Sequence, residues 1–130
     1  MSKYSINIKV TDDDLDDLHH VNNVRYLDWI QQISKEHWKL KADKHLQEEF
    51  IWVVRKHIIT YHSSAQINDN LLLETNIASS KGAISTRQVR IKNNLTNTLV
   101  VTSETEWCLI NPSNLRPVRI PEKVNNLFLN

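Results

Sequence analysis

The sequence predicts an α+β domain in which one long helix packs on one antiparallel sheet. Three observations lead to this class. A single stretch, residues 22–40, has the spacing of a long amphipathic helix. One alternating stretch precedes it at residues 4–10, and four more follow between residues 50 and 110. No helical stretch separates those four, so we expect them to form an antiparallel meander in chain order, joined by tight turns.

The first strand and the helix are assigned from periodicity. Alternate residues of the strand are mostly apolar: Tyr4, Ile6, Ile8 and Val10. The spacing of the helix places one set of residues on a common face: Tyr26, Leu27, Ile30, Ile33 and His37. Asn22 or Asn23 is suited to cap this helix, because an Asn side chain accepts hydrogen bonds from the free amides of a first turn.

The remaining elements follow in chain order. Residues 41–49 are polar with little periodicity, which predicts a short helix or a loop. Four strands are predicted at residues 50–62, 71–79, 84–92 and 98–110. In the first of these we expect unbroken alternation, with Trp52, Val54, Lys56 and Ile58 on one face. Gly82 is expected to supply a positive φ in a turn. Residues 116–121 are held extended by proline, and residues 122–130 predict a short terminal helix.

The composition limits the possible classes of protein. The chain has 130 residues, 40% of them hydrophobic, which suits one domain over residues 1–130. A net charge of +1 implies no steering toward nucleic acid or an anionic membrane, and no apolar run is long enough to span a bilayer. The amino terminus lacks an apolar signal segment and Cys108 is the single cysteine, so we expect a cytoplasmic protein. One glycine excludes a glycine-rich phosphate loop.

The chemistry concentrates where an acidic loop meets the helix. Five aspartates occupy residues 12–17, and His19 and His20 follow directly before the helix. First-turn amides are free and the helix dipole makes that end electropositive, so an amide there can stabilise an oxyanion. A carboxylate just upstream can act as a general base or nucleophile. From the residues alone, a solvated acidic loop with a plain cap is the favoured interpretation, because runs of charge usually lie on the surface.

Residues 14–23, DLDDLHHVNN, followed by Tyr26-Leu27-Asp28-Trp29, resemble the signature of hotdog-fold thioesterases. The likeness is to both the 4-hydroxybenzoyl-CoA thioesterase-like group and the acyl-ACP thioesterases (ACP is acyl carrier protein). Residues 52–55 and 107–121 match the acyl-ACP thioesterases as well. The resemblance implies a hotdog fold, in which a five-stranded antiparallel sheet wraps the central helix. It also implies hydrolysis of an acyl-CoA or acyl-ACP thioester to free acid and thiol.

The resemblance assigns roles to three residues. Asp16 matches the catalytic carboxylate, as nucleophile toward the thioester carbonyl or as base for a water. His20 matches a histidine that assists catalysis, although a structural imidazole is the alternative. Asn23 lies where a backbone amide of the first turn faces the thioester oxygen. Asp14 is expected to shape the loop through hydrogen bonds to backbone amides.

Two positions depart from the family pattern. His19 stands where the family often has Gly or Gln, so a backbone conformation that needs Gly would be strained there. Leu18 stands where acyl-ACP thioesterases have an Asn of the catalytic set. The departure at Leu18 favours the simpler mechanism of the 4-hydroxybenzoyl-CoA group, and both departures support the alternative of a non-catalytic acyl-thioester-binding protein. A hotdog hydratase ranks last, because the carboxylates precede the helix.

Four basic residues are candidates for binding the phosphates of CoA or phosphopantetheine: Arg55, Lys81, Arg87 and Arg90. No resident cofactor is expected, and no metal, because the histidines lack ligand spacing. An apolar slot for the acyl chain is expected among Tyr26, Trp29, Ile30, Ile33 and Trp52, which serve equally well as core.

Partners are expected to be the thioester substrate and a second copy of the chain. The resemblance implies a homodimer paired edge to edge, possibly assembling into a tetramer, with the active sites at the interface. We expect Trp107 and Val101 of the last long strand to contribute to the seam. The acyl group, the choice between CoA and carrier protein, and the mode of action of Asp16 stay open.

Overall fold

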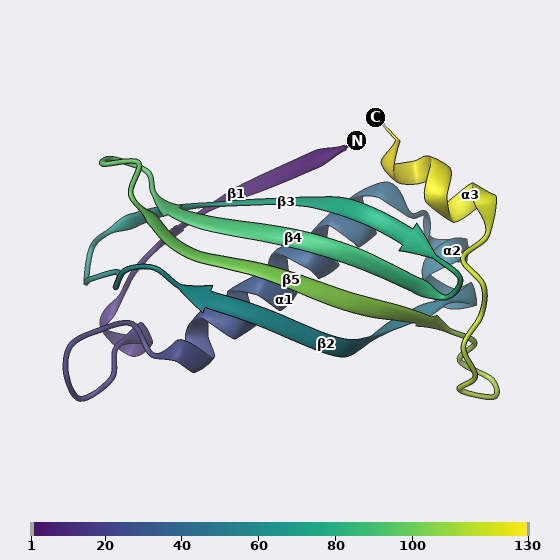
Figure 1. The fold of residues 1–130 in the computed structure, drawn as a ribbon, viewed down its shortest axis with the longest axis horizontal. Coiled ribbons are helices and arrows are strands. Elements are labelled where there is room, and N and C mark those ends of the chain that lie inside the picture. The colour runs from purple at the N-terminus through teal and green to yellow at the C-terminus, as the bar shows by residue number, and fades with distance from the viewer. Residues whose placement is uncertain (1, 130) are drawn as a thin grey trace.

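A computed structural model describes residues 2–129, and a five-stranded antiparallel sheet curves around one long helix (Figure 1). The strands are β1 (Lys3–Lys9), β2 (Ile51–Tyr61), β3 (Asn70–Lys81), β4 (Ile84–Asn93) and β5 (Leu99–Ile110). The helices are η1 (Asp12–Asp14), α1 (Asn23–Lys41), α2 (Lys44–Glu49), α3 (Glu122–Asn125) and η2 (Asn126–Phe128). The predicted α+β class is confirmed. No helix within residues 2–129 is both long and apolar enough to cross a bilayer.

The strand order is β1-β3-β4-β5-β2, so the expected four-strand meander is wrong for β2. Strands β3, β4 and β5 do pair in chain order. Strand β2 instead pairs with β5, and β1 takes the place beside β3. The reason is the link over residues 62–69, which is longer than a hairpin turn. It crosses to the end of β1, where the Asn68 amide donates to Val10 O and the Val10 amide to Asp69 O, both at 2.9 Å.

Strand β2 does not alternate without interruption. The pairing with β5 shifts register between Val54 and Lys56, which is a β-bulge at Arg55. After the bulge the parity of the strand changes, so His57 and Ile59, rather than Lys56 and Ile58, continue the half-buried face. The expected face containing Trp52, Val54, Lys56 and Ile58 is therefore wrong beyond the bulge.

The core lies between α1 and the concave face of the sheet. Its fully buried residues include Ile30 and Ile33 of α1 and Leu71 and Leu73 of β3, all with no exposed surface. The predicted helical face holds except for Leu27, which is half-buried; Trp29 and Ser34 are buried as well. A second, smaller cluster packs α3 against the carboxyl end of β5: Phe50, Leu109, Ile120 and Val124.

His37, on α1, contacts residues near both ends of the described chain. Its Nε2 lies 3.1 Å from Ser2 Oγ, and its Nδ1 accepts from Arg87 Nη1 at 2.8 Å. Its ring stacks on Tyr4 at 5.4 Å and meets the edge of Phe128 at 4.9 Å. Burial, and then the charge of Arg87, lower the pKa of His37 to about 4. The imidazole is therefore neutral at pH 7, and its Nδ1 accepts a hydrogen bond from the Arg87 N–H.

The buried His37 predicts a loss of stability in mild acid. An unfolded His binds its proton below about pH 6.5, whereas folded His37 resists protonation until about pH 4. The contribution is complete above pH 6.5 and is lost as the pH falls toward 4. Between pH 7 and pH 4.5 this one group should remove roughly 2–3 kcal/mol from the free energy of unfolding. Urea unfolding at the two pH values measures it.

His37→Gln is the control, because its amide oxygen can still accept from Arg87 but does not titrate. Whatever its absolute stability, its pH-dependent loss should be smaller than that of the unmodified protein by that amount. The same loss in both proteins would show that His37 does not carry the effect.

Candidate active site

The loop over residues 15–21 is a tight, closed turn. Leu15 and Val21 form an antiparallel bridge at its base, and the Asp16 amide donates to His20 O at 2.7 Å. His19 has φ +62°, in the left-handed region that glycine adopts without steric cost. The chain therefore does adopt the glycine-like conformation at the position where the resembling family often has Gly.

Backbone amides orient the carboxylate of Asp16. Its Oδ1 accepts from the Leu18 amide at 2.9 Å and from the His20 amide at 3.1 Å. Its Oδ2 makes no hydrogen bond within residues 2–129. The side chain is half-exposed. One oxygen is thus held in place while the other is free to approach a substrate.

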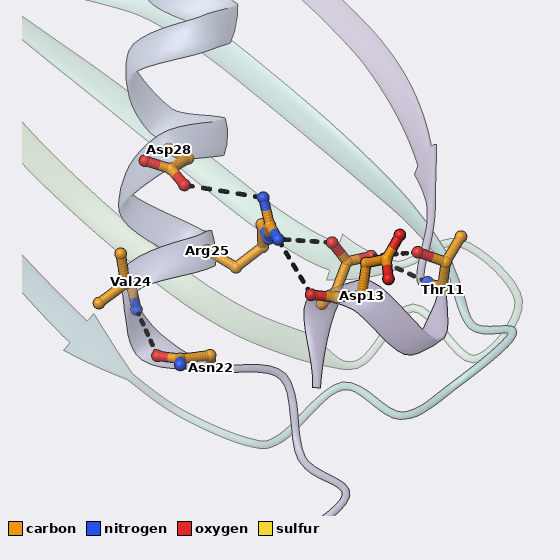
Figure 2. A network of polar contacts seen from close by, with 7 residues as sticks. Thr11, Asp13, Asn22, Val24, Arg25 and Asp28 are labelled. Atoms are coloured by element: carbon orange, nitrogen blue, oxygen red, sulfur yellow. Dashed lines mark hydrogen bonds and ion pairs between the residues drawn. The ribbon is translucent and has the colours of Figure 1, made fainter. Parts of the chain in front are cut away.

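At the start of α1, one backbone amide donates no hydrogen bond within the described residues. Asn22 caps the helix, as predicted, with its Oδ1 accepting from the Val24 amide at 3.0 Å (Figure 2). Asn23 is the first helical residue and is exposed. In the part of the chain that the structure describes, its amide donates to no acceptor. This amide lies at the electropositive end of α1 and is free to bind an anionic oxygen.

The acidic loop and the helix are joined through Asp14 and Arg25. Arg25 Nε lies 3.0 Å from Asp14 Oδ1, and Arg25 Nη2 donates to Asp13 O at 2.9 Å; Figure 2 shows Arg25 extending from α1 toward η1. Asp14 is buried, and its Oδ2 accepts from the Thr11 amide at 2.8 Å. Its carbonyl accepts from the Asn22 amide at 2.8 Å. Asp14 shapes the loop, as the sequence predicted.

Asp16 and Asn23 line one open cleft of about 330 Å³. Its walls are Asp16, His20, Val21, Asn23, Tyr26, Tyr61, His62, Ser63 and Ser64. The structure therefore brings together all three residues predicted to act in catalysis. The far wall, residues 61–64, was not predicted, because its place depends on the path of the link after β2. Tyr26 fixes that link, since its hydroxyl accepts from the Ala65 amide at 3.0 Å.

Leu18 does not line the cleft, and its side chain is 75% exposed. Of the expected acyl-slot residues, Tyr26 alone reaches this cleft. Trp29, Ile30 and Ile33 are core, and Trp52 lines a second cavity farther along α1.

The four basic candidates do not converge. Arg55 and Arg90 are exposed; Arg55 Nε lies 3.5 Å from Glu106 Oε1. Lys81 is exposed at the end of β3. Arg87 is only 5% exposed and lies on the inner face of β4. No group of three His, Cys, Asp or Glu residues within 2–129 is close enough to hold a metal.

The two residues expected at an edge-to-edge dimer seam do not lie at an edge of the sheet. Trp107 and Val101 are buried on the inner face of β5. Strand β5 lies between β4 and β2, so it is not at an edge. The edges of the sheet are β1 and β2.

The model of the acyl-ACP thioesterase N-terminal domain matches residues 1–128. No curated protein sequence matches the chain.

Three solved structures illustrate the similarity of fold. A probable thioesterase from Bartonella henselae is 26% identical, with a TM-score of 0.78, covering 93% of this chain and 100% of its own. A 1,4-dihydroxy-2-naphthoyl-CoA thioesterase from Synechocystis is 13% identical, with a TM-score of 0.87 and coverage of 99% and 97%. A hypothetical protein from Staphylococcus aureus, solved in complex with CoA, is 16% identical, with a TM-score of 0.86 and coverage of 97% and 81%.

The fold is that of the hotdog thioesterases, and the family model spans nearly every residue, including the loop and helix start that form the cleft. The chain therefore belongs to the acyl-ACP thioesterase N-terminal domain family, a family of thioester hydrolases.

Proposed function

We propose that the protein hydrolyses an acyl-CoA or acyl-ACP thioester with Asp16, His20 and the Asn23 amide as its catalytic groups. One observation carries the proposal: an oriented carboxylate with a free oxygen shares a cleft with an unclaimed amide at a helix start. The thioester carbonyl fits between them, with its carbon toward Asp16 Oδ2 and its oxygen toward the Asn23 amide.

The amide stabilises the negative charge that develops on the carbonyl oxygen when the carbon is attacked. Asp16 acts in one of two ways. As nucleophile, its oxygen displaces the thiolate to give an acyl-aspartyl anhydride, which water then hydrolyses. As base, it takes a proton from a water whose hydroxide adds to the carbon, and the thiolate leaves with that proton. His20 lies in the same cleft, where its imidazole can orient the water or protonate the departing sulfur.

The exposed basic residues are proposed to bind the carrier of the acyl group. Arg55, Lys81 and Arg90 are open to solvent, and each is suited to a phosphate group of CoA or phosphopantetheine, but the three do not converge on one site. Arg87 is left out of this set because it is buried. That a staphylococcal protein of the same fold binds CoA supports CoA as one carrier.

Asp16→Asn should lower kcat/KM for acyl-CoA hydrolysis by about 10²–10⁴-fold, which is the usual contribution of a general base. The Asn side-chain oxygen can still accept from the Leu18 and His20 amides, so the loop should keep its shape. Thiol release measured with a chromogenic disulfide reagent reports the rate, using short, long and aromatic acyl-CoA substrates.

Asp17→Asn is the matched control, because Asp17 is the exposed neighbour and lines no part of the cleft. It should retain normal turnover. Full activity in Asp16→Asn would refute the assignment, and thioester binding without any thiol release by the unmodified protein would favour a non-catalytic binding protein.

Asn23→Pro tests the oxyanion site by deleting a single N–H group. Proline is favoured at the first position of a helix, and Asn22, with φ −64° and ψ 133°, already has the conformation that a following proline requires. The fold should therefore persist while kcat falls by about 10²–10³-fold. Asn23→Ala keeps the amide and should stay close to normal activity. Equal rates in both variants would place the oxyanion elsewhere.

We also propose that the chain forms a homodimer through the edge strand β2. Four large apolar residues of β2 are between 38% and 47% exposed: Ile51, Val53, Ile58 and Tyr61. An unpaired edge with such residues is prone to aggregate unless it is covered, and a second copy covers it with its own β2. Tyr61 also lines the Asp16 cleft, so this pairing puts the cleft beside the interface.

Sedimentation velocity should give twice the monomer mass. In the double variant Val53→Lys and Ile58→Lys, like charges would face each other across the two strands and shift the protein toward monomer. Leu95→Lys is the control, because Leu95 is 90% exposed in the turn between β4 and β5. A monomeric unmodified protein at every concentration would exclude the dimer.

A further inference from the structure

A second cavity, of about 210 Å³, opens between the carboxyl-terminal half of α1 and the inner face of the sheet. Five aromatic residues line it: Trp38, Phe50, Trp52, Trp107 and Phe128. Trp38 is fifteen residues beyond Asn23 along α1, which is roughly 20 Å at the rise of an α-helix. The core residues Ile30 and Ile33, with no exposed surface, lie between the two positions. This aromatic cavity is therefore separate from the Asp16 cleft.

Arg87 lies at this cavity as a buried cation, and residues 2–129 supply no anion to pair with it. It is 5% exposed, and Nη1 donates to two neutral acceptors, His37 Nδ1 at 2.8 Å and Thr75 Oγ1 at 3.1 Å. Within residues 2–129 no carboxylate reaches it, and its Nε and Nη2 make no hydrogen bond. Burial lowers the pKa of Arg87 to about 10, so it is still charged at neutral pH. A buried charge of this kind is costly unless an opposite charge accompanies it.

The rest of the lining favours an anion too. Trp107 Nε1 is a buried donor with no partner within the described chain. Ser85 is opposite Trp107 in the β4–β5 register and precedes Arg87 on the same face of β4. Lys35 and Lys39 contribute from α1, and among the described residues no aspartate or glutamate lines the cavity. Donors and positive charge thus gather inside otherwise aromatic walls.

We propose that the aromatic cavity binds a small organic carboxylate with an apolar body, whose charge pairs with Arg87. The free Nε and Nη2 of a guanidinium match the two oxygens of a carboxylate. The aromatic walls pack on the body of the ligand, which a cavity of this size restricts to one ring or a short chain. The site goes beyond the proposed hydrolysis at Asp16 and does not depend on it, although that reaction would release acids of this class.

Calorimetry on the unmodified protein tests the proposal with two matched pairs of probes. Phenylacetate and hexanoate carry the carboxylate, whereas phenylacetamide and hexanamide have the same shape without the charge. We expect each acid to bind at least about tenfold more tightly than its amide, which corresponds to about 1.4 kcal/mol. Equal affinities for acid and amide, or no binding of the acids at millimolar concentration, would overturn the proposal.

The four tryptophans locate the ligand. Their indole N–H signals in a ¹⁵N-labelled sample are separate reporters, because Trp38, Trp52 and Trp107 line the aromatic cavity whereas Trp29 belongs to the core. Phenylacetate should move the Trp107 signal and leave that of Trp29 in place. A shift of Trp29 without Trp107 would put the ligand elsewhere and contradict the assignment.

Variants test the charge of Arg87 and separate this site from the proposed enzyme activity. Arg87→Met should abolish the preference for acid over amide, while Arg90→Met, on the outer face of the same strand, should keep it. If Arg87→Met fails to fold, the acid and amide comparison on the unmodified protein still decides. Asp16→Asn should bind phenylacetate normally, so a failure of this site and a failure of thioester hydrolysis are distinguishable.

Discussion

The position of the helix start against the acidic loop is the constraint on which the Asp16 cleft depends. Buried Asp14 sets it, by accepting from Thr11 and pairing with Arg25 while its carbonyl holds the Asn22 amide. Because Arg25 is partly exposed, the ion pair itself adds little to stability. Its value is geometric: it joins two segments so that a carboxylate and a free amide share one cleft.

The two ends of α1 lie beside positive charges of different kinds. At the amino end, an unclaimed amide and the helix dipole offer partial positive charge to a solvent-open cleft. Near the carboxyl end, a full positive charge is buried under aromatic side chains, with neutral His37 as its neighbour. The first arrangement suits a charge that appears transiently during reaction, because solvent and substrate exchange freely. The second suits a charge that stays, because burial strengthens any pairing it makes.

Local patterns in the sequence predicted the elements, because these depend on neighbours in the chain, whereas the resemblance to hotdog thioesterases singled out Asp16, His20 and Asn23. Helix periodicity placed Ile30 and Ile33 in the core, and Asn22 was recognised as a cap. Nonlocal features were missed. The pairing of β2 with β5 depends on where the link over residues 62–69 crosses, and the bulge at Arg55 depends on the partner strand. Arg87 was taken for a phosphate ligand because an inward-facing arginine and an outward-facing one have the same alternating pattern.

The contact between Ser2 and Phe128, near the two ends of the described chain, has a topological consequence. The Ser2 amide donates to Phe128 O at 2.9 Å, and both residues meet His37. Figure 1 shows the two ends of the ribbon side by side at one end of the sheet. A few linking residues would close residues 2–128 into a ring, and a circularly permuted chain opened at the exposed turn around Leu95 would keep every strand pairing intact.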